Sequence, residues 1–357
     1  MVYFFFGTKA QIIKSEYVLK ELNNLNINIK IINTNQHVEI TNRILNKVTF
    51  LFEVIELNSI TQNANSVMKV ISFFLKNLWC ILFKRLNIEK KSYCILHGDT
   101  LSTLLGVAFC KRYGLKIIHI EAGYKSKFLF KPFPEELIRR IVTYFSDYLV
   151  CDGEIQYGNL TKYKSHKKII RISQNTIADS VFHNIPSNIV KKNNLIITLH
   201  RTENIFNKKK LLQFIELITS IQKEIQFNRI TWYLHETTRS KILKIYGLSY
   251  FDDMNIQLLD LVPHNEFIKL IAESRTVITD GGSIKQECSL LNIPTLIWRD
   301  VDDDPTYSTP NILITNYSFL MSVNFLKESL FEEGGKINQL TKSPSKELAD
   351  QLLDIVT

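Results

Sequence analysis

Three acidic side chains in the segment 97–139 stand where predicted strands end or a predicted helix begins. Asp99, in "HGDT", and Glu121, in "HIEAG", each follow a short apolar run that predicts a buried strand. Glu135 opens a helical pattern just after Pro134. Ligand crevices of open α/β sheets form outside the carboxyl ends of the strands. Several acids directed at one crevice indicate that a substrate gains or loses protons there, so this segment predicts acid–base catalysis.

A second segment, "TDGGSIKQE" (279–287), has the composition of a phosphate-binding turn. A predicted strand is followed by the small residues 281–283 and then by a helix, whose amides and dipole favour an anion. Glu287 lies about one turn into that helix, where its carboxylate can accept hydrogen bonds from a ribose diol. The Walker ending and the third glycine of a dinucleotide fingerprint are missing. A glycine turn with a capping serine explains the local sequence equally well.

Two histidines and two lysines also lie where predicted strands end or a predicted helix begins. His200, in "TLHRTEN", and His235, in "WYLHETTRSK", each follow a predicted strand, where an imidazole can carry a proton near neutral pH. A lone histidine of this kind is more often structural, but the expected position of His200 at a domain cleft favours a function. Lys9 and Lys14 flank the helix start after the first strand, a place that favours anions. An ordinary strand-to-helix turn with surface lysines explains "FFFGTKAQIIK" as well.

The loop "WRDVDDDPTY" (298–307) concentrates acidic residues, namely Asp300, Asp302, Asp303 and Asp304. Such a loop is able to bind a cation or a hydroxyl-rich ligand. A solvated acidic turn before a proline is the favoured interpretation.

Short β-rich runs alternate with helical runs along the chain, which predicts an α/β fold with parallel, doubly wound sheets. The predicted strands are 2–6, 28–33, 93–97, 116–120, 147–151, 168–172, 195–199, 230–235, 256–260, 276–279 and 294–298. Helical patterns include 101–112, 135–146, 207–224 and 284–291. We expect two Rossmann-like domains facing a cleft, 1–175 and 176–340, with a hinge in the polar stretch 173–194. A final helix within 341–357 is expected to pack back on the first domain.

Composition excludes some classes of protein. The chain has 357 residues, of which 45% are hydrophobic, and this length favours two domains over a single core. The net charge of +9 is spread along the chain, without the arginine-rich arm or the aromatic–basic pattern of a nucleic-acid platform. Solvated lysines explain the charge best. Attraction of an anionic substrate or a membrane surface stays open.

The cysteines and one apolar segment give expectations about the cellular location of the protein. The five cysteines are Cys80, Cys94, Cys110, Cys151 and Cys288. They form no metal-binding spacing, which predicts core thiols, a reducing cytoplasm and no metal site. The start of the chain lacks the features of a signal peptide. Segment 70–86 is interrupted by Lys76 and is shorter than the roughly 20 residues of a spanning helix. A buried helix or a subunit contact is favoured over peripheral membrane contact.

Taken together, these motifs resemble the UDP-N-acetylglucosamine 2-epimerase family, which has the two-domain architecture of the GT-B glycosyltransferases. "GTKAQIIK" is similar to the family's GTRPExIK, "NQH" to GQH, "HGDT" to HGDT, and "HIEAG" to HxEAG. "PEELIR" is similar to PEExNR, "QNTIAD" to GNTxID, "TLHRTEN" to TxHRxEN, and "TDGGSIKQE" to TDSGGxQEE. Their shared order and comparable spacing extend through most of the chain.

The resemblance implies a reaction at C2 of a UDP-sugar. The family removes the C2 proton and expels UDP from C1, giving a 2-acetamidoglucal. UDP is then added back with the proton delivered to the opposite face, or water completes a hydrolysing variant. Inversion needs proton transfer on both faces, hence more than one acid or base. The residues carried over as catalytic are Asp99, Glu121, Glu135, His200 and Arg139. Those assigned to substrate binding are Lys9, Lys14, His235, Phe267, Gly281, Gly282, Ser283 and Glu287.

Within this set, Lys14, His200 and the amides of 281–283 are expected to hold the diphosphate. Phe267 falls where the family packs the uracil, and Glu287 where it holds the ribose. Because clustered carboxylates raise one another's pKa, one is expected to be protonated while another is not.

Several positions depart from the family pattern. Residues 9–11 replace Arg-Pro-Glu, Ile138 replaces an asparagine, and Gly281 and Ser283 exchange the usual serine and glycine. Asp304 stands where the family has an arginine that faces the nucleotide-sugar, and this reverses the charge. Val38 replaces the arginine after the GQH turn, which contributes to an allosteric substrate site in non-hydrolysing members. Substrate activation is therefore not expected.

The leading hypothesis is a cytoplasmic, metal-independent homodimeric enzyme without a cofactor. It converts UDP-GlcNAc to UDP-ManNAc for surface-polysaccharide synthesis and has no nucleic-acid partner. The alternatives are a hydrolysing epimerase that releases UDP and ManNAc, a GT-B glycosyltransferase that uses a UDP-sugar, and a non-catalytic nucleotide-sugar binder.

Overall fold

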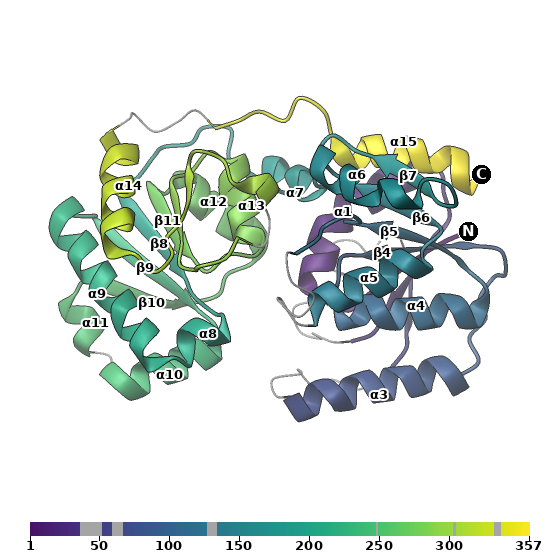
Figure 1. Cartoon of the computed structure of the whole chain (residues 1–357), viewed down its shortest axis with the longest axis horizontal. Coiled ribbons are helices and arrows are strands. Elements are labelled where there is room, and N and C mark those ends of the chain that lie inside the picture. Colours follow the sequence, from purple (N-terminus) through teal and green to yellow (C-terminus); the bar gives the residue numbers. More distant parts are fainter. Residues whose placement is uncertain (36–51, 59–66, 127–133, 248, 303–304, 332–336) are drawn as a thin grey trace. The chain divides into compact units, whose positions relative to one another are not determined.

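The computed structural model describes residues 1–35, 52–58, 67–126, 134–247, 249–302, 305–331 and 337–357. The chain forms two compact units (Figure 1). Unit 1 comprises Met1–Ser180 and Thr341–Thr357, and unit 2 comprises Val181–Leu340. The loop at 36–37, Val38, Asp303 and Asp304 lie outside the described residues.

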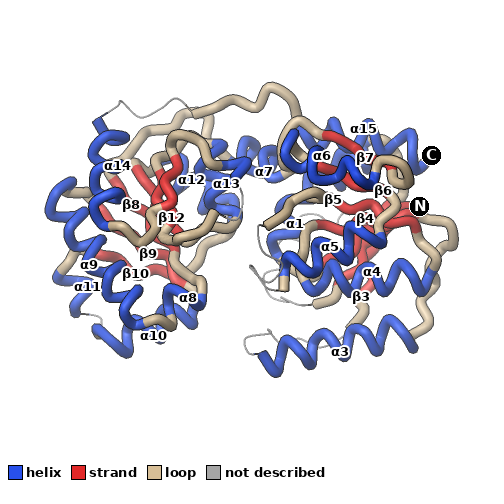
Figure 2. The backbone as a smooth tube through the Cα atoms, in the orientation of Figure 1, coloured by secondary structure: helices blue, strands red, loops and turns tan. Residues whose placement is uncertain are grey.

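Unit 1 is built on a seven-stranded parallel sheet of order β3-β2-β1-β4-β5-β6-β7 (Figure 2). Its strands are β1 (Val2–Phe6), β2 (Ile29–Asn33), β3 (Glu53–Glu56), β4 (Tyr93–His97), β5 (Lys116–Ile120), β6 (Tyr148–Cys151) and β7 (Lys168–Arg171). Its helices are α1 (Lys9–Asn24), α3 (Val67–Phe83), α4 (Leu101–Tyr113), α5 (Glu135–Phe145), α6 (Glu154–Leu160) and α15 (Pro344–Val356). The helix α7 (Ile177–Asn184) crosses the boundary to unit 2.

Strand β1 shows why this sheet is buried on both faces. Phe4 and Phe6 join the apolar layer that includes side chains of α1 and α15. Tyr3 and Phe5 point the other way, into the layer formed with α4 and α5. Successive side chains of a strand alternate between the two faces, so a continuous apolar run is required at the centre of a doubly covered sheet.

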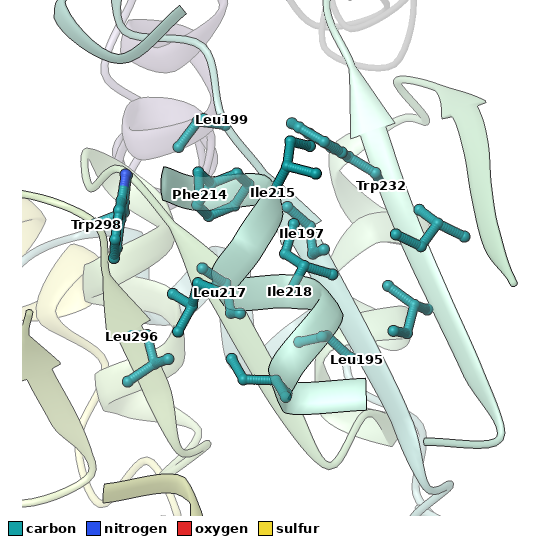
Figure 3. Close-up of a cluster of buried hydrophobic side chains, with 14 of the residues drawn as sticks. Leu195, Ile197, Leu199, Phe214, Ile215, Leu217, Ile218, Trp232, Leu296 and Trp298 are labelled. Atoms are coloured by element: carbon teal, nitrogen blue, oxygen red, sulfur yellow. The ribbon is translucent and has the colours of Figure 1, made fainter. Parts of the chain in front are cut away.

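Unit 2 is built on a six-stranded parallel sheet of order β10-β9-β8-β11-β12-β13. Its strands are β8 (Asn194–Thr198), β9 (Arg229–Leu234), β10 (Ile256–Asp260), β11 (Thr276–Thr279), β12 (Thr295–Ile297) and β13 (Ile312–Ile314). Its helices are α8 (Thr202–Ile205), α9 (Lys208–Ile225), α10 (Glu236–Tyr246), α11 (Ser249–Asp253), α12 (His264–Glu273), α13 (Ser283–Leu290) and α14 (Phe319–Phe331). Figure 3 shows Phe214, Leu217 and Ile218 of α9 in a buried cluster with Trp232 of β9 and with Trp298, which follows β12.

The predicted fold class, two doubly wound α/β domains with parallel sheets, is confirmed. The sequence prediction missed two short strands. Strand β3 has charged residues at both ends and β13 has only three residues, so neither carries the apolar run of a central strand. The stretch predicted as a hinge contains α7, whose first half packs in unit 1.

The helix α3 is not buried. It packs against α4 (Figure 1), while its outer side exposes a stripe formed by Met68, Ile71, Leu75, Trp79, Leu82 and Phe83. Among the described helices, none combines the length and the apolar character needed to cross a bilayer. This apolar stripe of α3 therefore lies on the surface of unit 1.

Candidate functional site

In unit 1, the turn between β1 and α1 is hydrogen-bonded to the end of β4. The carboxyl ends of β1 and β4 lie side by side where the strand order of the sheet reverses, the place where doubly wound sheets bind ligands. Gln11 accepts hydrogen bonds from the backbone N–H groups of Gly7 and Thr8 and donates to His97 O at 2.8 Å. An amide is suited to this position because it both accepts and donates.

Glu121 follows β5 in a backbone conformation that is rare for a residue with a side chain, with φ of 65°. Conformations of this kind cost about 1–3 kcal/mol and are concentrated at functional sites. The carboxylate is held from three directions. Lys14 Nζ lies 2.5 Å from Oε1, Asn175 Nδ2 donates to the same oxygen at 2.6 Å, and His97 Nε2 lies 3.5 Å from Oε2.

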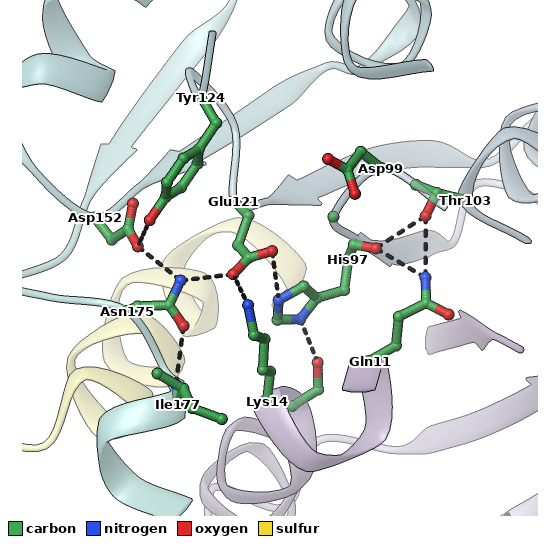
Figure 4. A network of polar contacts seen from close by, with 12 residues as sticks. Gln11, Lys14, His97, Asp99, Thr103, Glu121, Tyr124, Asp152, Asn175 and Ile177 are labelled. Atoms are coloured by element: carbon green, nitrogen blue, oxygen red, sulfur yellow. Dashed lines mark hydrogen bonds and ion pairs between the residues drawn. The ribbon is translucent and has the colours of Figure 1, made fainter. Parts of the chain in front are cut away.

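The contacts of Glu121 continue into a larger polar network (Figure 4). Asn175 also donates to Asp152 Oδ2 at 2.7 Å, and Tyr124 OH donates to the same oxygen at 2.7 Å. On the other side of Glu121, His97 Nδ1 lies 2.6 Å from Ser15 Oγ. The orientation of Glu121 is therefore fixed by side chains from separate segments of unit 1.

Asp99 forms the second acidic position. Its Oδ2 lies 2.6 Å from Arg139 Nε of α5. Arg139 is itself supported by the buried Glu136, which also accepts a hydrogen bond from Ser126 N at 2.9 Å. Glu135 occupies the first residue of α5, and its Oε2 is buried without a hydrogen-bond partner among the described residues.

The two acids that follow β4 and β5 have opposite pKa shifts. Burial raises the pKa of Asp99, and the charges of Glu121 and Glu135 act in the same direction, against the lowering effect of Arg139. Burial also acts to raise the pKa of Glu121, but Lys14 and His97 together hold it well below its usual value. The two carboxyl groups are therefore unequally disposed to hold a proton, through burial of Asp99 and through the cationic neighbours of Glu121.

His119 is also buried at the end of the sheet. Its Nε2 lies 2.9 Å from the carbonyl oxygen of Gly98, and burial lowers its pKa to about 4. A neutral imidazole that donates to this carbonyl stabilises the turn, whose Gly98 has φ of 69°. His119 thus supports the turn that carries Asp99.

In unit 2 the strand order reverses between β8 and β11. His200 lies just beyond β8, and its Nδ1 is 3.0 Å from Oδ1 of Asp280, which follows β11. Asp280 Oδ2 accepts hydrogen bonds from the backbone N–H groups of His200 and Arg201 at 2.9 and 2.7 Å. Burial acts to raise the pKa of Asp280, but these hydrogen bonds and His200 lower it. Asp280 thereby fixes the turn that presents His200.

The glycine turn after β11 leads directly into α13. Gly281 and Gly282 have φ of 104° and 72°, a region that favours glycine. The alternative interpretation, a turn capped by the serine, is wrong, because Gly282 occupies the N-cap and Ser283 is the first helical residue. The helix start therefore has no side-chain cap, which suits an external acceptor such as a phosphate.

Glu287 and Phe267 lie on neighbouring helices of unit 2. Glu287 Oε1 is 3.0 Å from His264 Nε2, and its buried Oε2 has no hydrogen-bond partner within the described part of the chain. Phe267 meets the ring of Tyr233 edge-on, at 5.5 Å between centroids. The His235 ring lies 5.5 Å from that of His200, so these two histidines are neighbours.

Part of the acidic loop has a partner. Asp302 Oδ1 lies 2.5 Å from Nζ of Lys285, a buried residue of α13 that also donates to Ser308 Oγ at 2.9 Å. Asp300 is exposed. In the described residues, no three acidic, histidine or cysteine side chains gather in a way that suits a metal ion. For Asp302, an ion pair replaces the predicted solvated turn.

The structure brings together Asp99, Glu121, Glu135, Arg139 and Lys14 through contacts or mutual electrostatic influence in unit 1. Lys9 begins α1. Sequence reasoning did not select His97, Asp152, Asn175 or Asp280. Asp152 and Asp280 each directly follow a strand, as Glu121 does and Asp99 nearly does, so the same strand-end pattern identifies them. His97 and Asn175 lie within motifs whose other residues were chosen.

The chain is similar to known proteins in sequence. A model of the UDP-N-acetylglucosamine 2-epimerase family matches residues 20–307. The UDP-N-acetylglucosamine 2-epimerase of Methanocaldococcus jannaschii is 28% identical over 316 residues, which cover 84% of this chain and 83% of that protein. The UDP-2,3-diacetamido-2,3-dideoxy-D-glucuronate 2-epimerase of Pseudomonas aeruginosa is 30% identical over 220 residues, 59% of this chain and 60% of that protein.

Similarity extends to three dimensions. A crystal structure of the M. jannaschii UDP-GlcNAc 2-epimerase in complex with UDP-GlcNAc and UDP matches with a TM-score of 0.79 and 25% identity. That match covers 99% of this chain and 99% of the other. Since the family model covers well over half of the sequence and the folds agree along nearly all of it, this chain belongs to the UDP-N-acetylglucosamine 2-epimerase family.

Proposed function

We propose that this protein inverts C2 of a UDP-N-acetylhexosamine, converting UDP-GlcNAc to UDP-ManNAc for surface-polysaccharide synthesis. The reaction removes the C2 proton, expels UDP from C1, and adds UDP back with a proton delivered to the opposite face. The observation that carries this proposal is the pair Asp99 and Glu121. They follow neighbouring strands, and their pKa values are shifted in opposite directions.

The opposite shifts suit a reaction that needs proton transfer at two faces of one carbon. Enzymes separate the pKa values of paired carboxyl groups so that one is ionised and the other holds a proton. In our proposal the ionised Glu121 accepts a proton and Asp99 donates one, with Glu135 as the third acid of unit 1. Arg139 and Lys14 keep these groups oriented through the ion pairs already described.

Unit 2 is proposed to bind the nucleotide. The uncapped start of α13 at Gly281, Gly282 and Ser283 offers backbone N–H groups to the diphosphate, and His200 donates to it. Electrostatic stabilisation of this kind lowers the barrier to departure of the leaving group. Glu287 has a buried oxygen available to the ribose, and Phe267 provides a ring for the uracil.

The direct test is NMR of the purified protein with UDP-GlcNAc in D₂O. Deuterium at C2 together with UDP-ManNAc establishes the epimerase, whereas free UDP with ManNAc identifies a hydrolysing enzyme. An unchanged spectrum overturns the proposed substrate. The diacetamido-glucuronate nucleotide named by the P. aeruginosa relative is then the next sugar to supply.

Variants separate catalysis from binding. Glu121→Gln is expected to abolish exchange of the C2 proton of UDP-GlcNAc, Asp99→Asn is expected to abolish formation of UDP-ManNAc, and both should leave UDP binding intact. The exposed Asp350 of α15 provides a matched control, because Asp350→Asn also removes one carboxylate of unit 1. Retained exchange in Glu121→Gln, or retained formation of UDP-ManNAc in Asp99→Asn, contradicts the proposed acid–base roles.

We further propose that the protein is a homodimer that forms through the exposed stripe of α3. Six large apolar side chains along one helix face are unusual for a solvated surface. In a two-fold dimer the same stripe on each subunit covers the other. All five cysteines are free, which supports a reducing, cytoplasmic location.

A further inference from the structure

Unit 2 contains a cavity of about 670 Å³ that the proposed reaction does not use. It is lined by the ends and faces of β8 and β9, by Leu259 of β10, and by the last turns of α12. Arg229 and Asn194, which line it, are the first residues of β9 and β8. The cavity thus opens toward the amino edge of the sheet, whereas His200 and Gly281 lie at the carboxyl edge. Its volume falls in the range of small-molecule sites.

One wall of the cavity is a row of polar side chains on β9. Arg229, Thr231 and Tyr233 alternate along the strand and therefore share one face, over roughly 13 Å at the usual rise per residue. Thr231 and Tyr233 are each only 5% exposed. Neither hydroxyl has a hydrogen-bond partner in the part of the protein that the structure describes. Both residues line the cavity, where a bound molecule can hydrogen-bond to their hydroxyl groups.

The cavity also has an excess of positive charge. The Lys192 ammonium is neutralised by Glu273. The exposed guanidinium of Arg229 makes no ion pair or side-chain hydrogen bond among the described residues, and the exposed Lys191 makes one long contact, with Ser274 O at 3.3 Å. An ammonium group has three donors and a guanidinium five. Partial burial lowers the pKa of Lys191 to about 8.

The remaining lining distinguishes between classes of anion. Ile196 and Leu270 provide an apolar surface opposite hydroxyl and amide groups, including those of Asn194 and Thr231. A fatty acid would leave this polar row unsatisfied, and a bare inorganic anion would leave most of the volume unfilled. A sugar ring offers hydroxyl groups on its edge and C–H groups on its faces, and a phosphate dianion matches two uncompensated cations.

We propose that this cavity is a binding site for a phosphorylated sugar, with Lys191 and Arg229 holding the phosphate and Thr231 and Tyr233 contacting the ring. The site is separate from the residues proposed to bind UDP. Tyr233 of the cavity packs against Phe267 of that set in a T-shaped contact, with 5.5 Å between the ring centroids.

The test is isothermal titration calorimetry of the full chain with glucose 6-phosphate, in the presence of saturating UDP so that the nucleotide site is filled. We expect one binding event per chain. Lys191→Met and Arg229→Gln should each weaken it about ten-fold or more, because hydrogen bonds to charged groups are lost. Thr231→Val and Tyr233→Phe keep the shape of the wall, and each should weaken binding about three-fold.

The controls are the same type of substitution at an exposed position outside the cavity, and ligands that lack either the phosphate or the sugar. Lys223→Met, at an exposed position of α9, should leave binding unchanged. Glucose without phosphate should not bind, and orthophosphate should bind more weakly than the sugar phosphate. The proposal is overturned if wild-type protein gives no heat with glucose 6-phosphate, or if the Lys191 and Arg229 variants bind it like wild type. Equal affinity for orthophosphate would exclude a role for the ring contacts.

Discussion

The Lys14 ammonium lies 2.5 Å from the Glu121 carboxylate, and this ion pair joins α1 to the end of β5. It is largely withdrawn from solvent, with side-chain exposures of 12% and 15%. An ion pair in such a place keeps the acid ionised by an effect that water screens only weakly. The sequence analysis assigned Lys14 to the diphosphate. In the structure Lys14 also lowers the pKa of the Glu121 carboxyl group.

Lys14→Met should therefore raise the pKa of Glu121. Because the pKa of Glu121 is held well below its usual value, we expect the acidic limb of the wild-type pH–rate profile at low pH, and it should move to higher pH in the variant. We expect kcat/KM for C2 exchange near neutral pH to fall at least about ten-fold, the equivalent of ~1.4 kcal/mol. Lys14→Arg should restore the position of the limb, because it keeps the charge. An unmoved limb in Lys14→Met would show that the pair does not control Glu121.

Asp99 should make stability depend on pH in the opposite sense to an ordinary ion-paired acid. Its pKa is raised above the usual 3.8 in the folded protein, so the folded state binds more proton than the unfolded state between these two values. Its contribution to the free energy of unfolding is then present at low pH and is lost as pH rises through the folded pKa. Asp99→Asn removes this titration.

We expect the stability of wild type relative to Asp99→Asn to decrease as pH rises from about 4 toward 7, measured by urea unfolding. Asp350→Asn, at an exposed site, should show no such trend. A difference that instead grows with pH would mean that Arg139, rather than burial, dominates the pKa of Asp99.

The sequence predicted both sheets and the residues at their carboxyl edges because buried parallel strands carry continuous apolar runs. It did not predict β3, since Glu53 and Glu56 interrupt that pattern at a sheet edge. It also did not predict how the acids are held. The contact of Asn175 with Glu121 joins residues 54 positions apart. Such pairs depend on the order of strands in the sheet, and periodicity within a segment carries no information about that order.

Gly7 is a position where a single methyl group should be destabilising. A Cβ there would lie 2.1 Å from both Ser102 Oγ and Thr34 Oγ1, so one of two packed turns must shift. We expect Gly7→Ala to lower the free energy of unfolding by about 1–3 kcal/mol, the usual range for overpacking. Gly158→Ala is the matched control, because its Cβ would meet nothing within 4 Å. Equal stability of the two variants in urea unfolding would contradict this account.

Glu287 should bind the ribose and distinguish UDP from 2′-deoxy-UDP. Its buried Oε2 has no partner among the described residues, and a ribose hydroxyl would supply one. Wild-type protein is therefore expected to bind UDP about ten-fold more tightly than 2′-deoxy-UDP, and Glu287→Gln should lose most of that preference. Glu266→Gln, an exposed change on α12, should keep it. A preference that survives in Glu287→Gln would place the ribose elsewhere.

The stripe on α3 should control self-association. Trp79 is 62% exposed and Ile71 is 48% exposed, and a polar or charged residue at the centre of an apolar interface is strongly unfavourable. Light scattering is expected to give a dimer for wild type and a monomer for the double variant Trp79→Lys, Ile71→Glu. Ile155→Lys, at an equally exposed position on α6, should remain dimeric. A wild-type monomer that co-sediments with anionic vesicles would instead assign this stripe to a membrane surface, because the same apolar side chains insert into a lipid interface.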